Sequence, residues 1–266
     1  MISPMPPLFS GAHSGEHLVH FYGTEESALI ESVSAYFAAG LERGEFALAV
    51  ATPAHASAFV AHLESKGLDT KELTDAGRLV LLDAAATLSR LLVDNYPDRV
   101  RFDNVVGGTI RRLLEQNPAG LRAYDEMVGL LWQQSNCPAA IRLEQLWDGL
   151  QKAAHFSLFC AYPIDVFHES FDTGVLGALI SAHSHLLPAA RNGDIQHALD
   201  RALDDVMGAQ APAIRDQLAG HGHGATDCSL PAAEASILWL RSNLADRAGD
   251  ILSRAREHYA GNRSAL

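Results

Sequence analysis

The stretch GEFALAVATP, residues 44–53, predicts a buried β-strand that leads directly into a helix. Its apolar run, Phe46 to Ala51, has the length of a strand covered on both faces and is far too short to span a membrane. Gly44 bounds the run on one side, and Thr52-Pro53 bounds it on the other, where a helix follows. A strand of this kind is typical of an α/β domain.

The same alternation of a short apolar run and a longer helical pattern recurs along the chain. It predicts five strands, over residues 17–22, 46–51, 79–83, 121–124 and 156–162. Helices are expected over residues 24–40, after Pro53, and over residues 85–95, 102–116, 127–134, 138–153 and 175–185. We therefore expect a three-layer, mostly parallel sheet with right-handed crossovers, in which ligands bind at the carboxyl ends of the strands.

The segment beyond residue 190 contains no run that predicts a strand. Two helical patterns, residues 194–218 and 231–259, flank a loop that contains His221 and His223. The second pattern carries an apolar stripe that must pack on the α/β domain, the slightly preferred alternative, or on a second copy of the chain. We expect an α/β domain over residues 15–188 and a helical extension over residues 189–266, which serves dimerisation or output.

Composition and charge exclude several classes of protein. The chain has 266 residues and a formal net charge of −12, and its 20 Lys and Arg residues are scattered, which argues against a nucleic-acid surface. No apolar run approaches a membrane span, and residues 1–13 do not resemble a signal peptide, so we expect a cytoplasmic protein. The three cysteines, Cys137, Cys160 and Cys228, are expected to be reduced, with Cys160 as a buried packing residue.

Five separate motifs, taken together, resemble one known family. They are His17-x-x-His20-Phe21-Tyr22, Glu126-Met127-Val128 before Leu131-Trp132, Asn136 with Leu143-Glu144-x-x-Trp147, Cys160-Ala161-Tyr162-Pro163, and His183-Ser184-His185-x-x-Pro188. Their order and spacing, over residues 15–188, resemble the MEDS domain, a sensory domain of methanogens and methylotrophs that is typified by the regulator of dichloromethane dehalogenation. The chain departs from the expected pattern at Val19 and Asp148.

The resemblance implies a fold similar to the RecA/KaiC-like ATPases, with a degenerate phosphate-binding loop. It also implies a sensor of simple hydrocarbon derivatives that acts with a histidine kinase or a transcription regulator, as in two-component systems. Possible partners are thus a small organic ligand, a signalling protein and a second copy of the chain through its C-terminal helices. Direct contacts with nucleic acid or membranes are not expected.

A phosphate-binding loop needs glycines followed by a lysine, and this chain does not provide them. None of Lys66, Lys71 and Lys152 follows a glycine, and the loop after the first predicted strand carries Glu25 and Glu26. Two carboxylates at a helix N-terminus repel a triphosphate. We therefore expect no ATP hydrolysis, and we assign no catalytic residue, no cofactor and no metal site to the chain.

Residues near the strand ends are the candidates for ligand contact. His17 and His20 are three residues apart on a predicted strand, so their side chains point to opposite faces of the sheet. At most one of them therefore lines a pocket, and either can be a hydrogen-bonded core residue. Tyr22, at the end of the strand, is better placed. Asp125 can cap the next helix, while Glu126 can face the pocket or favour the positive end of that helix.

Aromatic and histidine side chains complete the predicted set. Trp132 and Trp147 pack in a core or form the walls of a pocket for a small apolar ligand, and the resemblance adds Tyr162. His183 and His185 interact with a helix end or converge on a metal if that helix frays. His221 and His223 could hold adventitious zinc or nickel, although a solvated loop is the default.

The leading hypothesis is therefore a small-molecule sensor of the MEDS type. One alternative is a protein-interaction module that holds a kinase or regulator without binding a ligand. Another is a residual nucleotide-using enzyme. Fold analogy alone does not decide among the three.

Overall fold

The computed structural model describes residues 15–23, 26–169, 171, 185–187, 194–221 and 230–263. The chain forms two compact units. The first comprises Met1–His20 and Glu26–Pro163, and the second comprises Phe21–Glu25 and Ile164–Leu266. Among the described residues, no helix is both long and apolar enough to cross a membrane.

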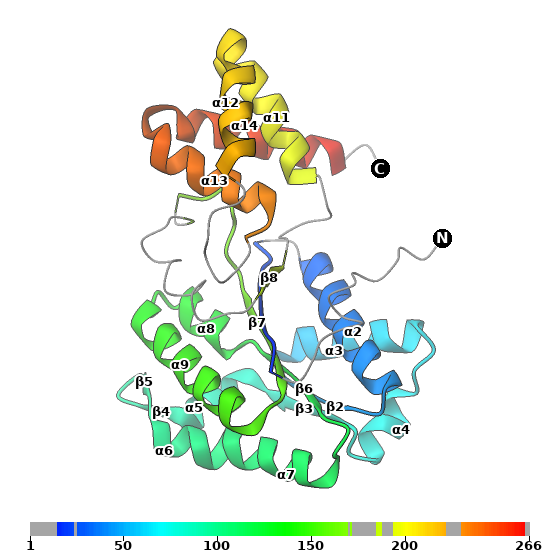
Figure 1. Ribbon diagram of the computed structural model, residues 1–266. Coiled ribbons are helices and arrows are strands. Elements are labelled where there is room, and N and C mark those ends of the chain that lie inside the picture. Colours follow the sequence, from blue (N-terminus) through cyan, green and yellow to red (C-terminus); the bar gives the residue numbers. More distant parts are fainter. Residues whose placement is uncertain are drawn as a thin grey trace. The chain divides into compact units, whose positions relative to one another are not determined.

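Six of the strands form one sheet (Figure 1). Its order is β3-β2-β6-β7-β1-β8, and its strands are β1 (His17–Phe21), β2 (Phe46–Ala51), β3 (Leu79–Asp83), β6 (Leu121–Asp125), β7 (Ser157–Tyr162) and β8 (His185–Leu187). The pairs β2–β3, β2–β6 and β6–β7 are parallel. The predicted α/β class with a parallel sheet covered by helices on both faces is confirmed.

Helices α2 (Glu26–Glu42) and α3 (Pro53–Ser65) lie on one side of the sheet in Figure 1, and α8 (Met127–Gln133) and α9 (Cys137–Ala154) lie on the other. The ring contacts of Tyr36 on α2 and Phe59 on α3, with Phe159 and Tyr124 respectively, identify the face that α2 and α3 cover. The remaining helices of this unit are α4 (Thr70–Asp75), α5 (Ala84–Leu91), α6 (Arg99–Phe102), the π-helical turn Asp103–Gly107 and α7 (Gly108–Gln116).

Side-chain caps define where several helices begin. Asp83, the last residue of β3, accepts a hydrogen bond from the backbone N–H of Ala86 and so starts α5. Asn136 caps α9 through the N–H of Ala139, and Pro138 occupies the first turn, where its missing N–H is not needed. The chain therefore passes from β3 to α5, and from α8 to α9, with few intervening residues.

The helix predicted over residues 85–95 is wrong beyond Leu91. The chain instead forms an antiparallel hairpin of β4 (Leu92–Val93) and β5 (Tyr96–Pro97). Asp94 and Asn95 form its turn with φ values of 51° and 59°. Asp and Asn adopt this left-handed conformation more readily than other non-glycine residues, and a two-residue turn with positive φ matches the twist of a hairpin.

Arg122 on β6 is fully buried, yet the surrounding structure compensates its charge. Its Nε donates to the Glu45 carboxylate at 2.8 Å, and one terminal nitrogen donates to the backbone carbonyl of Tyr36 at 2.8 Å. The guanidinium carbon also lies 4.9 Å from the centroid of the Tyr36 ring. Gly40 makes room for this side chain, because a Cβ there would come within 2.4 Å of the Arg122 Cδ atom.

The second unit is helical in its C-terminal part, with α11 (Asp194–Met207), a 3₁₀ turn (Gly208–Gln210), α12 (Ala211–His221), α13 (Ala232–Asn243) and α14 (Ala245–Arg263). Helix α14 packs along α11, an arrangement that neither predicted alternative for the apolar stripe included. Asp205 on α11 pairs with Arg254 at 2.7 Å and with His258 at 2.8 Å, both on α14. The helix predicted over residues 231–259 is interrupted at Leu244.

Two histidine positions also differ from the prediction. His185 begins strand β8 instead of ending a helix. Leu187, the last residue of that strand, precedes Pro188, and a residue before proline is pushed toward an extended backbone. His221 is the last residue of α12 and does not lie in a loop. His183 and His223 lie outside the described residues.

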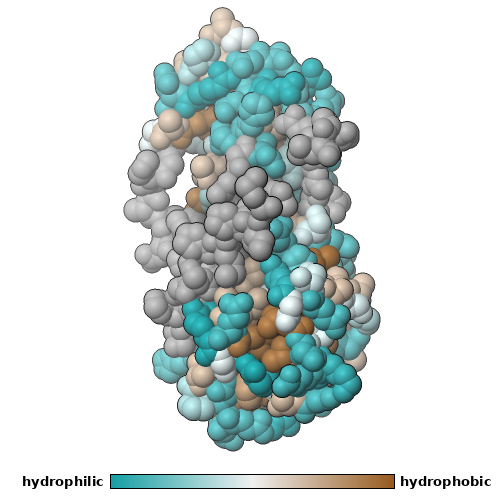
Figure 2. All heavy atoms as spheres, turned by 90° about the vertical axis from the view of Figure 1, so that its right-hand side faces the viewer, coloured by the Kyte–Doolittle hydropathy of each residue, from teal (hydrophilic) through white to brown (hydrophobic). Residues whose placement is uncertain are grey.

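One face of the molecule, drawn in Figure 2, is mostly hydrophilic. A hydrophobic area lies in the lower half of this view. The large apolar side chains are mostly interior, which agrees with a sheet covered on both faces.

Candidate functional site

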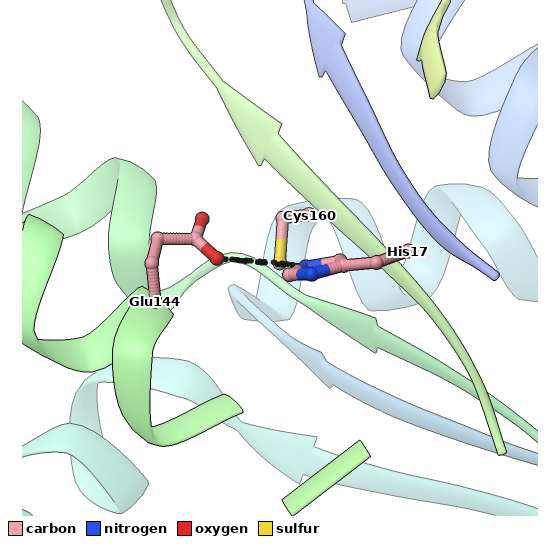
Figure 3. Close-up of side chains that lie close together, drawn as sticks. All are labelled: His17, Glu144 and Cys160. Atoms are coloured by element: carbon pink, nitrogen blue, oxygen red, sulfur yellow. Dashed lines mark hydrogen bonds and ion pairs between the residues drawn. The ribbon is translucent and has the colours of Figure 1, made fainter. Parts of the chain in front are cut away.

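A cluster of polar side chains is buried on the face of the sheet that α9 covers. We call it the buried cluster, and its members are His17, Asp125, Glu144, Cys160 and Tyr162. All five residues are at most 2% exposed. Figure 3 shows three of them, with His17 reaching from β1 and Glu144 from α9 to meet Cys160 on β7.

Strand register brings these residues together. Asp125 on β6 and Cys160 on β7 are direct partners in the parallel ladder. Tyr162 lies two residues beyond Cys160 and therefore on the same face of the sheet. Glu144 and Trp147 lie three residues apart on α9, so both reach this face from one side of the helix.

Close contacts connect the members of the cluster. The Nε2 atom of His17 lies 3.3 Å from the Cys160 sulfur and 3.5 Å from Oε2 of Glu144. The Cys160 thiol donates to the same Oε2 atom at 3.6 Å. The Tyr162 hydroxyl donates to the other oxygen, Oε1, at 2.5 Å. Glu144 is thus the acceptor at the centre, and its two oxygens have different partners.

Asp125 extends the cluster toward Trp147. Its Oδ2 accepts the indole N–H of Trp147 at 2.9 Å, and its Oδ1 accepts the backbone N–H of Met127 at 3.2 Å. Burial raises the pKa of the Asp125 carboxyl well above its usual range, and the neighbouring Glu144 carboxylate adds to this effect. Hydrogen bonds from Met127 and Trp147 act in the opposite direction.

The thiol and the phenol are held in their protonated forms. Burial raises the pKa of Cys160 and of Tyr162 well above their usual values, and the charge of Glu144 raises both further. At neutral pH both groups are therefore hydrogen-bond donors. The donor atoms of His17, Glu144 and Cys160 all lie within 4.8 Å of one another, so these three residues could also hold a metal ion.

A second arrangement, the Glu126 bridge, lies at the carboxyl ends of β2 and β6. Glu126 accepts the backbone N–H of Thr52 at 2.8 Å, the Thr52 hydroxyl at 3.2 Å and Nδ1 of His55 at 2.8 Å. The hydrogen bond to Glu126 is the main reason that the pKa of His55 is raised, and it exceeds the opposing effect of burial. A histidine held by a carboxylate in this way has a fixed ring orientation.

The structure separates several of the predicted residues. His17 belongs to the buried cluster, whereas the His20 ring lies 6.2 Å from that of Phe159 on the opposite face, as strand parity predicts. Trp147 packs edge-on against Phe102 and Phe156, and Trp132 packs edge-on against Tyr162. Asp125 accepts an N–H at the start of α8, and Glu126 turns to Thr52 and His55.

The other predicted residues lie elsewhere. Tyr22 is buried directly after β1 and belongs to the second unit. His185 begins β8, and His183 lies outside the described residues.

Sequence reasoning did not identify His55, and it assigned no role to Glu144. A signal was present for both. His55 stands three residues after the capping Thr52, where a side chain lies near the helix N-terminus. Glu144 interrupts the apolar face formed by Leu143, Leu146 and Trp147, and a carboxylate there must be buried with partners. Cys160 is buried as predicted, but it also contacts His17 and Glu144.

Comparison with known proteins identifies a family. The model of the MEDS family, the methanogen/methylotroph, DcmR sensory domain, matches residues 16–184 of the chain. The matched segment includes every member of the buried cluster and of the Glu126 bridge. A comparison with curated protein sequences finds no match.

Proposed function

This chain belongs to the MEDS family of sensory domains, and we propose that it is a sensor which binds a small organic ligand at the carboxyl ends of the strands. The bound state then regulates a signalling partner, a histidine kinase or a transcription regulator. The sensory role follows from the family, while the ligand and the partner are our proposals.

One observation carries the proposal: polar side chains are concentrated near the carboxyl ends of β2, β6 and β7. Asp125, Glu126 and Tyr162 lie at these ends and are buried. Burying polar groups is unfavourable unless they are hydrogen-bonded, and an apolar core of the same volume is often at least as stable. The carboxyl edge is also where ligands bind in open α/β sheets.

Aromatic rings adjoin these polar groups. The Trp132 ring lies 5.8 Å from that of Tyr162 in an edge-to-face arrangement. A site for a small organic molecule typically combines apolar walls with a few polar groups that fix its orientation. The Tyr162 hydroxyl and the Trp132 ring provide that combination within the first unit.

Thermal denaturation of the full chain tests the proposal. A compound that binds only the folded form raises the melting temperature in proportion to the logarithm of its concentration. Alcohols, halomethanes and nucleotides form the panel. The shift should shrink in Tyr162→Phe and persist in Tyr96→Phe, because Tyr96 is exposed on the β4–β5 hairpin. A wild-type protein that no compound stabilises would contradict ligand sensing.

We also propose that the chain does not hydrolyse nucleotides. The acid at the end of β6, Glu126, already accepts hydrogen bonds from Thr52 and His55, and no lysine follows a glycine. Phosphate release from ATP with magnesium should stay at the buffer rate for both the wild type and Glu126→Gln. Turnover by the wild type that Glu126→Gln abolishes would establish an enzyme instead.

A further inference from the structure

We propose that His17, Glu144 and Cys160 form a binding site for a thiophilic divalent metal ion of the zinc class, with a fourth coordination position that no Cys, His, Asp or Glu among the described residues fills. This inference goes beyond the sensory role and does not depend on the organic ligand. The three residues come from β1, α9 and β7, so rigid elements hold all three donor atoms (Figure 3).

The spacing of the donor atoms matches the edges of a zinc tetrahedron. With bonds of about 2.0–2.1 Å to nitrogen and oxygen and about 2.3 Å to sulfur, tetrahedral angles separate donor atoms by about 3.3–3.6 Å. The observed separations are 3.3 Å between His17 Nε2 and Cys160 Sγ, 3.5 Å between Nε2 and Glu144 Oε2, and 3.6 Å between Sγ and Oε2. One ion can therefore contact all three atoms with little movement of the side chains.

The hydrogen bond of Tyr162 divides the roles of the two Glu144 oxygens. The phenol donates to Oε1 at 2.5 Å, and Oε2 faces His17 and Cys160. A carboxylate that binds a metal through one oxygen is commonly oriented by a hydrogen bond to the other. Tyr162 is thus a positioning residue for the proposed site, and it does not itself contact the ion.

Charge balance also favours a divalent ion at this depth. A thiolate, a carboxylate and a neutral imidazole carry a total charge of −2, which one divalent cation neutralises. A neutral site avoids most of the desolvation penalty of a buried charge, and His17, Glu144 and Cys160 are all at most 2% exposed.

Binding must deprotonate the thiol. The sulfur–hydrogen bond of Cys160 breaks, a sulfur–metal bond forms, and the proton passes to solvent. Because this proton must leave before the sulfur can bind the metal, metal affinity should increase as the pH rises.

Metal content and X-ray absorption of the full chain provide the first test. The protein is produced with zinc in the medium and carries His221→Ala and His223→Ala to remove adventitious sites. We expect about one zinc per chain, bound by one sulfur at about 2.3 Å and by nitrogen and oxygen ligands. A sample without zinc, or with zinc bound by nitrogen and oxygen alone, overturns the proposal whether or not any variant folds.

Cobalt substitution with matched cysteine variants provides the second test. Cobalt bound by a thiolate gives a sulfur-to-metal charge-transfer band, which should disappear in Cys160→Ser and remain in Cys137→Ser. Cys137 is a partly exposed thiol at the start of α9. His17→Gln should reduce metal content about tenfold or more. A band that survives in Cys160→Ser, or a metal content unaffected by His17→Gln in folded protein, means that these residues only hydrogen-bond to one another.

Discussion

The two ends of strand β6 bury ionisable groups in different ways. Near its start, Arg122 is buried with the Glu45 carboxylate, the Tyr36 carbonyl and the Tyr36 ring around it. At its carboxyl end, Asp125 belongs to the buried cluster, together with the carboxylate of Glu144, the thiol of Cys160, the phenol of Tyr162 and the imidazole of His17. The first end pairs opposite charges, and the second gathers groups that compete for protons.

The difference separates structural from functional burial. A buried charge whose partners are all present is tolerated in the folded protein, and removing one of those partners strongly destabilises the fold. A group of acids with raised pKa values can instead change protonation or accept a cation, and such groups concentrate at functional sites. We therefore expect changes near Arg122 to affect stability alone, and changes in the buried cluster to affect stability in ways that depend on pH or metal.

Arg122→Ala should have the largest effect. It leaves a large cavity and removes the buried one of the cationic partners of Glu45, so the free energy of unfolding should fall by about 3–5 kcal/mol. Arg43 also pairs with Glu45, at 3.0 Å, but is 39% exposed, so Arg43→Ala should cost less than about 1 kcal/mol. Chemical denaturation of both variants measures the contrast. Similar losses in the free energy of unfolding for the two variants would show that the buried Arg122 contributes no more to stability than the exposed Arg43.

Glu126→Gln should lower the free energy of unfolding by about 1.5–3 kcal/mol, because an amide cannot accept all three hydrogen bonds of the Glu126 bridge. The loss should be larger at pH 6 than at pH 9. The pKa of His55 is raised in the folded state, so this stabilisation is fully present below the unfolded pKa and is lost as pH rises through the folded value.

Denaturation at the two pH values measures the loss for Glu126→Gln, and an NMR titration follows the ring of His55. The exposed Glu115 on α7 offers the control Glu115→Gln, which should change neither quantity. An unchanged His55 titration in Glu126→Gln would contradict the bridge.

Gly129→Ala should cost about 1–3 kcal/mol, because overpacking forces backbone to shift. A Cβ at Gly129 on α8 would lie 2.8 Å from the carbonyl oxygen of Ala161 on β7, next to the buried cluster. Gly149 on α9 has no atom within 4 Å of the equivalent position, so Gly149→Ala should stabilise the helix by up to about 1 kcal/mol. Melting curves that shift in the same direction for both variants would refute this close approach.

Asp125→Asn should give the smallest effect, a change in pH dependence. The folded-state pKa of Asp125 is raised, so its contribution to stability is present below the unfolded pKa, about 4, and is lost as pH rises through the folded value. The asparagine side chain of the variant does not ionise, so the variant does not lose this stability as the pH rises. The stability of the variant relative to wild type should therefore increase from pH 4 toward neutral pH, and a flat difference in denaturation experiments would contradict a raised pKa.

Much of the fold could be predicted because buried parallel strands leave a local signal. The runs at residues 46–51 and 79–83 match β2 and β3 at both ends. The β4–β5 hairpin was missed because its strands have two residues each, and only the Asp94-Asn95 pair marked the turn. Strand β8 has three residues, too few for a periodic pattern.

The candidate site was only partly predictable, since it depends on register between distant segments. The alternation of side chains along a strand was enough to place His17 and His20 on opposite faces of the sheet, as observed. The alternation could not show that His17 contacts Cys160, because that contact depends on β1 lying next to β7 in the sheet. The packing partner of the last helix was missed for the same reason, because the fit between α14 and α11 is tertiary.

The contact between His17 and Cys160 joins residues that are 143 positions apart in the chain. Closing so long a loop is among the slower steps of folding, and a ribosome must complete nearly the whole first unit before the two residues can meet. Products truncated before Cys160 therefore lack this contact. A metal ion at the proposed site could therefore bind only after β7 has been synthesised.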